Sequence, residues 1–347
     1  MPLTVTFFCG IRYTIPQLKQ TVTTKMRKQT KEPQTLMEAI QYYTNELRCV
    51  EFLTAIKWKD TGEKCCPKCG STKITYMRTR PTFLCKERGC KKQFSIKVGT
   101  VMECSKLPIT KWVPAIWLIV NNKNGISSYE LSRGIGVTQQ TAWFMLHRIR
   151  EAVSNGSLIK LSGTIEVDET GIGGKGRNMH KSKKAKFMKN GRITGNQTTV
   201  MGILERNGEV RAKVVADREK ETLVPEIIKH VEPDAILYTD SHSSYRRLNE
   251  LFGNHKMIDH TAYEYVNGDI YTNSIENFWT LLKRTVKGTY IQISPCHLNS
   301  YVIEQAFRYN TRKETDSERF SRAVGHIFGK RLKYKDLITR KNSFGKM

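Results

Sequence analysis

Hydrophobic and polar positions in the second half of the chain follow the periods of strands and helices in turn. Short apolar or alternating runs predict strands at residues 163–168, 198–204, 210–216 and 235–239, with 256–259 as a candidate fifth. Apolar residues at three- and four-residue steps predict helices at residues 221–231, 273–285 and 297–309. Three consecutive strands followed by helix, strand and helix favour an α/β core built on a mixed sheet.

The predicted helix 273–285 has an apolar face and a polar face. The apolar face consists of Ile275, Phe278, Trp279 and Leu282. Glu276 and Lys283 lie on another face, seven residues and therefore about two turns apart, roughly 10 Å along the helix. A carboxylate and a lysine thus face outward together. In the alternative interpretation, Asn273 and Glu276 form a capping box, and the glutamate only holds its own helix start.

Two aspartates stand where predicted strands end, Asp168 after the first strand and Asp240 after the fourth. With Glu276 they place one carboxylate at each of two strand ends and a third on a helix. Hard cations such as Mg²⁺ or Mn²⁺ take carboxylate oxygens as ligands, and two such ions about 3.5–4 Å apart promote phosphodiester exchange. We therefore predict a divalent metal site. Glu166 and Glu169 flank Asp168, and Glu166 shares its strand face, either beside this site or as a surface charge.

Four cysteines in the first third of the chain have the spacing of metal ligands. These residues are Cys66, Cys69, Cys85 and Cys90. Two pairs on tight turns, fifteen residues apart, predict a four-cysteine zinc ribbon with a structural Zn²⁺ and hairpins formed by residues 74–84 and 93–98. The alternatives are four reduced thiols without metal, or Cys65 as a ligand in place of its neighbour. The cysteines without paired spacing, interpreted as buried or free thiols, are Cys9, Cys49, Cys104 and Cys296.

A helix-turn-helix is predicted between residues 125 and 150. Its capping and turn residues are Ser127 or Ser128, Gly134, Gly136 and Thr138. Its buried face consists of Ala142, Leu146, Ile149 and Val153. By analogy with recognition helices, the residues expected to contact DNA are Gln139, Gln140, Trp143 and Arg148. His147 is interpreted as solvated or phosphate-facing. The alternative is a pair of short helices with no role in DNA binding.

The amino-acid composition of the chain limits the kinds of molecule that it is expected to bind. The formal net charge of +26 and the pI near 9.7 imply a polyanion, with nucleic acid as the first candidate and an anionic membrane surface as the second. The apolar run at residues 112–120 is about half as long as a bilayer crossing and contains Pro114. The first residues lack the basic region of a signal peptide, and nine cysteines without such a signal indicate a reducing compartment. We expect a DNA-binding protein without a membrane partner.

A basic stretch follows the first predicted strand. Residues 173–194 contain eight Lys or Arg, one His and no acidic residue. A solvated loop is one interpretation. Because the stretch begins five residues after Asp168, a clamp on DNA phosphates is the other. The lysines expected to contact phosphates are Lys181, Lys183, Lys184 and Lys186.

These patterns divide the chain into six parts. Residues 1–34 are interpreted as a variable extension, with the physiological start at Met26 or Met37. The other parts are a helical segment at 35–60, a zinc ribbon at 61–100, a helix-turn-helix region at 106–153, an α/β domain at 163–312 and a basic C-terminal tail at 313–347.

Several of these stretches together resemble the ISXO2-like insertion-sequence transposases, which are relatives of the eukaryotic Merlin elements. The resemblance runs from about residue 35 to about residue 312 and includes the zinc ribbon. Its other motifs are KNGISSYEL at 123–131, TAWFMLHRIR at 141–150, DETGIGG at 168–174 and IENFW at 275–279. The 35 residues between Asp240 and Glu276, and the lysine seven residues further on, also resemble the spacing in DDE transposases.

The resemblance implies a ribonuclease H-like catalytic domain that cuts and joins DNA ends. The acids that would bind Mg²⁺ or Mn²⁺ are Asp168, Asp240 and Glu276, and Lys283 would hold a phosphate unless it is only a solvated helix lysine. Some members of the group use Asn as the third catalytic residue, which leaves Asn273 open. The implied partners are double-stranded DNA at the element ends and target, and further copies of the chain. The implied location is the cytoplasm of a prokaryote or the nucleus of a eukaryote.

Two other classes of protein share parts of this pattern. A DNA-binding regulator with an inactive catalytic domain would bind DNA and never cut it. A ribonuclease H-like nuclease would cut without joining, so strand-transfer products separate it from a transposase. The presence of all three acids disfavours the regulator.

Overall fold

The computed structural model describes residues 32–154, 159–174, 178–184, 188–189, 192–193, 196–246, 248–258 and 272–343. The predicted extension up to residue 31 lies outside these residues. The chain divides into two compact units, each described here by itself. Unit 1 comprises Met1–Asn122, Ser128–Ala152 and Glu314–Lys333, and unit 2 comprises Lys123–Ser127, Val153–Lys313 and Tyr334–Met347. In the described part of the chain, no helix has both the length and the apolar character that crossing a bilayer requires.

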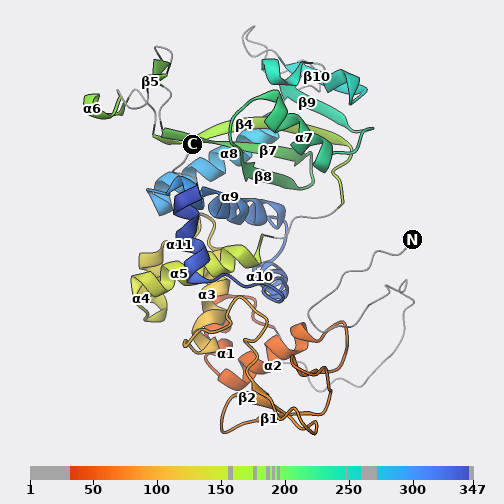
Figure 1. The fold of residues 1–347 in the computed structure, drawn as a ribbon, viewed down its shortest axis with the longest axis vertical. Coiled ribbons are helices and arrows are strands. Elements are labelled where there is room, and N and C mark those ends of the chain that lie inside the picture. Colours follow the sequence, from red (N-terminus) through yellow and green to blue (C-terminus); the bar gives the residue numbers. More distant parts are fainter. Residues whose placement is uncertain are drawn as a thin grey trace. The chain divides into compact units, whose positions relative to one another are not determined.

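Unit 1 is mainly helical (Figure 1). Its helices are α1 (Leu36–Tyr43), α2 (Glu46–Lys57), α3 (Ile109–Asn121), α4 (Ser128–Ile135), α5 (Gln139–Ala152) and α10 (Asp316–Gly325). Helix α3 contacts each of the others and is buried along most of its length, including the large side chains of Trp112 and Trp117. The apolar run that is too short for a membrane span is therefore the central helix of this unit.

The residues predicted to form a basic C-terminal tail, 313–347, instead contain two helices. Helix α10 belongs to unit 1 and begins with a capping box at Thr315. Its Phe320 is only 1% exposed, because the ring packs 5.0 Å from Trp117 and stacks at 5.5 Å on Phe52. This segment returns to complete the core of unit 1, so the prediction of a tail was wrong.

The cysteine-rich part of unit 1 forms a small antiparallel sheet in the order β1-β2-β3. Its strands are β1 (Ile74–Met77), β2 (Thr82–Cys85) and β3 (Gln93–Phe94). Phe83 and Phe94 are buried and stack at 5.5 Å, which gives the ribbon a core of its own. The predicted hairpin at residues 74–84 is confirmed, whereas of residues 93–98 only Gln93 and Phe94 form a strand, which pairs with β2.

Unit 2 is built on a five-stranded mixed sheet in the order β10-β9-β4-β7-β8 (Figure 1). Its strands are β4 (Thr164–Gly174), β7 (Asn196–Glu205), β8 (Val210–Val214), β9 (Ile236–Asp240) and β10 (Asn254–Ile258). Strand β7 runs antiparallel to both β4 and β8, whereas β9 runs parallel to β4 and β10 parallel to β9. The predicted α/β core with a mixed sheet is confirmed.

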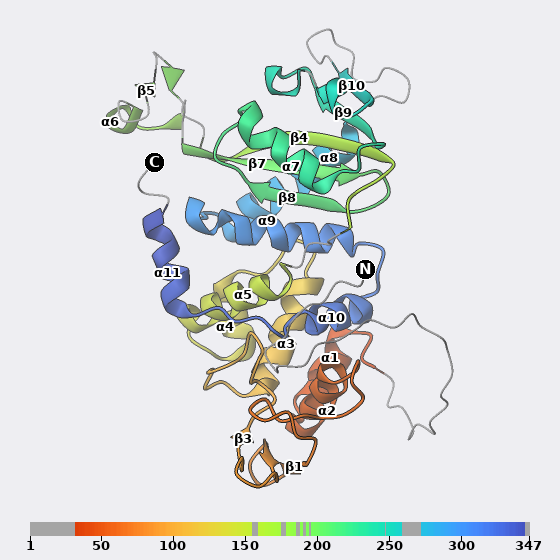
Figure 2. The same cartoon turned by 45° about the vertical axis from the view of Figure 1, so that its right-hand side comes forward.

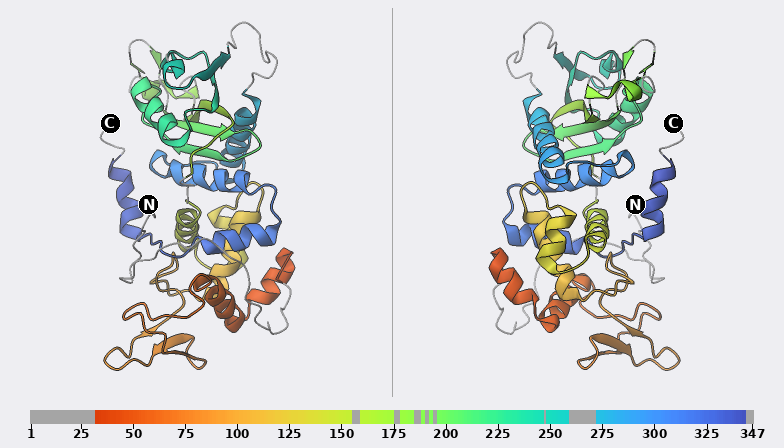
Figure 3. Two further views of the ribbon diagram at one scale, coloured as in Figure 1. Left: turned by 90° about the vertical axis from the view of Figure 1, so that its right-hand side faces the viewer. Right: turned by 90° about the vertical axis from the view of Figure 1, so that its left-hand side faces the viewer.

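Helices cover both faces of this sheet, with α7 on one side and α8 and α9 on the other (Figures 2 and 3). These helices are α7 (Lys220–His230), α8 (Asn273–Thr285), which continues into a π-helical turn at Val286–Tyr290, and α9 (Pro295–Asn310). The smaller elements of unit 2 are α6 (Lys181–Lys184), the paired strands β5 (Met188–Lys189) and β6 (Arg192–Ile193), and α11 (Tyr334–Ser343), which contacts α9. Each face of the sheet has its own apolar core.

Strand β4 is longer than predicted. It pairs with β7 over ten residues on each strand and continues to Gly174. Asp168 therefore lies in the middle of a strand, and the prediction that it stands at a strand end was wrong. Asp240 does end its strand.

Candidate active site

The three acids predicted to bind a divalent metal come from two strands of the unit 2 sheet and from helix α8. Asp168 and Asp240 lie on adjacent parallel strands, each two residues beyond the register pair of Glu166 and Tyr238. Glu276 lies in the first turn of α8 and is exposed. The fold thus brings together one carboxylate from the middle of β4, one from the end of β9 and one from α8.

The carboxylates repel one another. Burial raises the pKa of Asp168, the carboxylates of Asp240 and Glu276 raise it further, and a hydrogen bond from Trp279 opposes the rise. Burial also raises the pKa of Glu169 to about 8, again with contributions from Asp168 and Asp240. A cluster of partly buried carboxylates becomes fully ionised most readily beside a cation.

The donor set fits a hard divalent cation, because it consists of carboxylate oxygens. The arrangement is nevertheless more open than a closed ligand cage. Among the described residues, a group of three or more His, Cys, Asp or Glu ligand atoms within 4.8 Å of one another is formed by cysteines, not by these acids. The ligand atoms of the three acids therefore do not all lie within 4.8 Å of one another.

Glu166, which sequence analysis left as a neighbour of the site or a surface charge, is fully buried and anchors α8. One carboxylate oxygen accepts a hydrogen bond from Arg206 Nε at 2.8 Å, and the other accepts the backbone N–H of Ile275 at 2.9 Å. Arg206 also lies over the ring of Tyr238, 4.8 Å from its centroid. The residue immediately before Glu276 is thereby tied to β4.

The start of α8 also tests the interpretation of Glu276 as part of a capping box. The N-cap residue is Thr272, which makes no side-chain capping bond, and Asn273 is already the first helical residue. Asn273 is not the N-cap, and the N–H of Glu276 bonds to the carbonyl of Thr272 at 3.2 Å, so Asn273 and Glu276 do not form a capping box. The alternative in which the glutamate only holds its own helix start was wrong.

We expect Glu166→Ala to lower the free energy of unfolding by about 3–5 kcal/mol, because it removes a fully buried carboxylate that pairs with Arg206 and accepts the N–H of Ile275. Glu166→Gln should cost less, since its amide oxygen still accepts the N–H of Ile275. Urea unfolding of each variant measures the effect. Glu209→Gln is the matched control, because the side chain of Glu209 is half exposed and its ion pair with Arg211 is long, at 4.0 Å, and therefore weak. Equal losses in Glu166→Ala and the control would contradict the anchoring role.

The predicted polar and apolar faces of α8 are both present. The helix has the predicted bounds, and its buried residues are Ile275, Phe278, Trp279, Leu282 and Thr285. Glu276 and Lys283 are exposed. Two residues beside the site were not predicted: Arg206, which pairs with Glu166, and Gly202, which is the register partner of Asp168. The glycine inside an apolar strand was a signal for close approach of another group.

The residues predicted to contact DNA on α5 fall into two groups. Thr138 caps the helix by accepting the N–H of Thr141 at 3.3 Å, as predicted. Gln140 is exposed, whereas Gln139 and Trp143 are half-buried, and Gln139 donates a hydrogen bond to the hydroxyl of a serine in α4 at 2.8 Å. These three side chains reach the surface to different extents.

Arg148 and His147 do not reach it. Arg148 is 5% exposed, donates to the carbonyl of Glu103, and lies over the rings of Phe144 at 5.1 Å and Trp112 at 5.6 Å. His147 is 1% exposed. The core of unit 1 encloses both side chains, so the prediction of a DNA contact for Arg148 and of a solvated or phosphate-facing His147 was wrong.

The basic stretch after β4 is described only in part. Lys181, Lys183 and Lys184 lie in the short helix α6, and Lys181 is exposed. Lys186 lies outside the described residues. Phosphate contact by these lysines stays a prediction.

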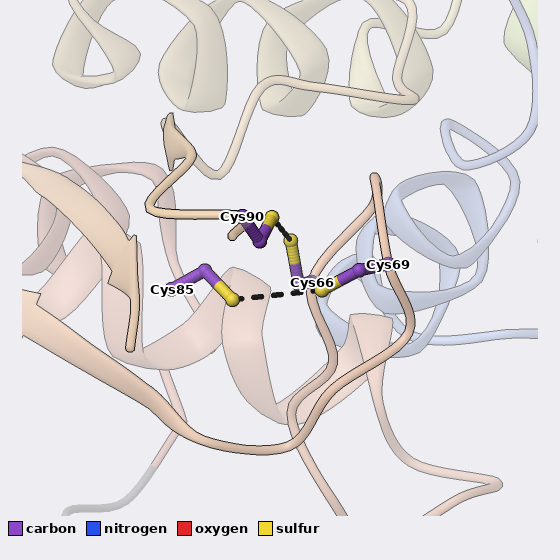
Figure 4. Close-up of side chains that lie close together, drawn as sticks. All are labelled: Cys66, Cys69, Cys85 and Cys90. Atoms are coloured by element: carbon purple, nitrogen blue, oxygen red, sulfur yellow. Dashed lines mark hydrogen bonds between the residues drawn. The ribbon is translucent and has the colours of Figure 1, made fainter. Parts of the chain in front are cut away.

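The four predicted zinc ligands in unit 1 converge (Figure 4). The sulfurs of Cys66 and Cys90 are 3.8 Å apart and those of Cys69 and Cys85 are 3.6 Å apart. A tetrahedral zinc with Zn–S bonds of about 2.3 Å separates its sulfurs by about 3.8 Å, so the cluster fits zinc. Gly70, at φ +72, allows the chain to turn back after the first pair.

Cys65, the alternative ligand, is not part of this cluster. Its sulfur accepts a hydrogen bond from the indole of Trp58 at 3.4 Å. The assignment of Cys66 and its three partners as the zinc-binding cysteines is therefore supported over the alternative that uses Cys65.

Comparisons with known proteins agree with this arrangement. The model of the ISXO2-like transposase domain matches residues 160–310, and the model of the transposase zinc-ribbon domain matches residues 44–93. A protein in the transposable element ISH50 of Halobacterium salinarum is 24% identical over 258 residues, which cover 72% of this chain and 85% of the relative. A transposase-like protein of Haemophilus influenzae is 33% identical over 102 residues, which cover 29% of this chain and 81% of the relative.

Both domain models describe parts of transposases, in the order in which the zinc cluster and the mixed sheet occur along the chain. The chain belongs to the ISXO2-like transposases. The resemblance inferred from the sequence motifs is thereby confirmed.

Proposed function

We propose that this transposase binds the ends of an insertion element as double-stranded DNA, cuts them and joins the freed ends to target DNA. The observation that carries the proposal is the proximity of three acids, Asp168 in the middle of β4, Asp240 at the end of β9 and Glu276 on α8. Three consecutive antiparallel strands, followed by α7 and two parallel strands beyond β4, support a ribonuclease H-like catalytic core.

In this proposal Asp168, Asp240 and Glu276 hold Mg²⁺ or Mn²⁺. Such ions activate a water or a 3′-hydroxyl and stabilise the leaving oxygen of a phosphodiester. The chain's own contribution is to hold the acids from rigid elements, since Glu166 binds α8 to β4 beside Glu276. Lys283, exposed on the same helix, holds a phosphate of the DNA near the acids.

DNA binding is assigned to unit 1 and to the basic stretch of unit 2. The net charge of +26 supports a polyanionic partner. In unit 1, α4 and α5 form the proposed helix-turn-helix, with Gln139, Gln140 and Trp143 as candidates for base contacts, and the zinc ribbon adds a second DNA-binding module. Assembly of several copies on the two element ends completes the proposal.

The test is an assay with labelled element ends, whose sequence is taken from inverted repeats that flank the gene. With Mg²⁺, we expect single-strand cuts at the ends and covalent joining to a second duplex. Cuts without joined products would instead identify a nuclease. Binding without any cut, with Mg²⁺ and with Mn²⁺, would identify a regulator with an inactive catalytic domain.

Replacing the four lysines of the basic stretch by Gln should reduce the salt dependence of DNA binding. Each phosphate contact on duplex DNA contributes about 0.9 to the slope of log affinity against log salt, so loss of two to four contacts flattens it by roughly 2–4. Fluorescence anisotropy at several salt concentrations measures the slope. An unchanged slope would mean that the stretch is only solvated. The substituted residues are Lys181, Lys183, Lys184 and Lys186.

A further inference from the structure

The indole of Trp279 is hydrogen-bonded to Asp168, one of the three acids of the candidate site. Trp279 lies on α8 and is 3% exposed, and its Nε1–H donates a hydrogen bond to Oδ2 of Asp168 at 2.8 Å. It lies one turn after Glu276, on the face of α8 that packs against the sheet. The same side chain therefore links the helix that carries the third acid to the strand that carries the first.

A glycine makes this contact sterically feasible. Gly202 of β7 is the register partner of Asp168. A Cβ at this position would lie 2.7 Å from Cη2 and 2.8 Å from Cζ2 of Trp279, and 3.1 Å from Cδ1 of Ile275. These separations are shorter than van der Waals contact, so any larger residue would displace the indole. The six-membered ring of the indole rests on bare backbone, directly beside the aspartate that it binds.

Two hydrogen bonds hold α8 on either side of Glu276. Glu166 binds the N–H of Ile275, and Asp168 accepts the indole N–H of Trp279, so alternate residues of β4 reach the same helix. The first contact involves a buried carboxylate that is paired with arginine. The second involves a carboxylate of the candidate site itself.

We propose that Trp279 is a positioning residue of the transposase: it orients the carboxylate of Asp168 and fixes the distance between Asp168 and Glu276, and Gly202 provides the space it needs. The inference rests on the proposed function, because it assigns Asp168 and Glu276 to the metal site. Groups that orient metal-binding carboxylates through a hydrogen bond contribute about 10- to 100-fold to metal affinity or activity.

The test replaces Trp279 by Phe, which keeps an aromatic ring in the core and removes the N–H. Mn²⁺ binding to the zinc-loaded full-length chain is measured without DNA, from the electron paramagnetic resonance signal of free Mn²⁺. Binding that Asp168→Asn abolishes defines the catalytic site. We expect Trp279→Phe to weaken that binding by about 10- to 100-fold and to slow the cutting of element ends by a similar factor.

Trp112→Phe in unit 1 is the matched control. Trp112 is 1% exposed, and its indole donates a hydrogen bond of 3.1 Å to the hydroxyl of Ser105. The control therefore removes an equally buried indole donor that does not touch an acid, and Mn²⁺ affinity should stay unchanged. Equal Mn²⁺ affinity in Trp279→Phe and in the unchanged chain would overturn the inference.

A second pair of variants tests the space beside the indole. Gly202→Ala should weaken Mn²⁺ binding in the unchanged chain, because its methyl group displaces the indole from Asp168. In the Trp279→Phe background the same substitution should have a smaller effect, since Phe lacks the ring atoms that meet the methyl group. A double-mutant cycle measures the difference. Equal effects in both backgrounds would overturn the role of Gly202.

The outcomes separate this inference from the proposed function. If the unchanged chain shows no Mn²⁺ binding that depends on Asp168, and cuts no element end, the proposed function fails and the inference fails with it. If the unchanged chain binds and cuts while Trp279→Phe does both equally well, only the inference fails.

Discussion

Replacing Glu276 by Gln is expected to reduce Mg²⁺-dependent cutting of element ends by at least about a hundredfold, while DNA binding stays near that of the unchanged chain. Two divalent ions carry four positive charges, and a neutral amide would leave Asp168 and Asp240 to balance them alone. Because Glu276 is exposed on α8, the substitution leaves the core intact. Cutting of a labelled end is measured beside binding of the same duplex.

Asn273→Ala is the control, since Asn273 is the other candidate for the third catalytic residue. It is exposed at the first position of α8, and the N–H of Ile275 is held by Glu166 instead. We therefore expect most of the cutting activity and nearly all of the stability to be retained. If Glu276→Gln cuts normally and Asn273→Ala is inactive, the catalytic role belongs to Asn273.

The parts of the fold that depend on local pattern could be predicted from sequence. The bounds of α8 agree with the prediction because its apolar stripe is a property of thirteen consecutive residues. The cysteine cluster also agrees, since zinc ligands on two tight turns require a fixed spacing. Both features are recognisable without knowing what the rest of the chain does.

Features that depend on distant partners could not be predicted. The first strand was predicted to end at residue 168, yet β4 continues to Gly174 because β7 pairs with the whole segment. Glu166 was left open as a neighbour of the site or a surface charge, because its partner Arg206 lies forty residues further along the chain.

The misassigned Arg148 has the same explanation. Its position on α5 resembled that of a DNA-reading side chain, but a carbonyl from residue 103 and aromatic rings of unit 1 enclose it. The last helices were missed because residues 313–347 are rich in charge, although Phe320, Val324 and Ile327 are buried in the core of unit 1. Long side chains with apolar stems are buried when such partners exist, which sequence alone does not reveal.

Replacing Cys66 and Cys85 together by Ser should release the zinc and unfold roughly residues 64–98. In a small ribbon the free energy of metal binding is also the free energy of folding, because the core around Phe83 and Phe94 is too small to hold the strands alone. We expect about one zinc per chain before the change and none after it. Atomic emission measures the metal, and hydrogen exchange measures the loss of protection in β1, β2 and β3.

The matched control also replaces two cysteines by Ser, Cys65 and Cys104, which lie outside the cluster. It should keep its zinc and its protection from exchange, because neither sulfur belongs to the four that converge. Binding of element ends should fall in the Cys66 and Cys85 variant and not in the control. The Asp168-dependent Mn²⁺ binding of that variant should persist, because the apolar cores on the two faces of the unit 2 sheet do not include the ribbon. Unchanged zinc content in the Cys66 and Cys85 variant would refute the ligand assignment. Equal zinc loss in the control would show that zinc binding does not depend specifically on the four cysteines of the cluster.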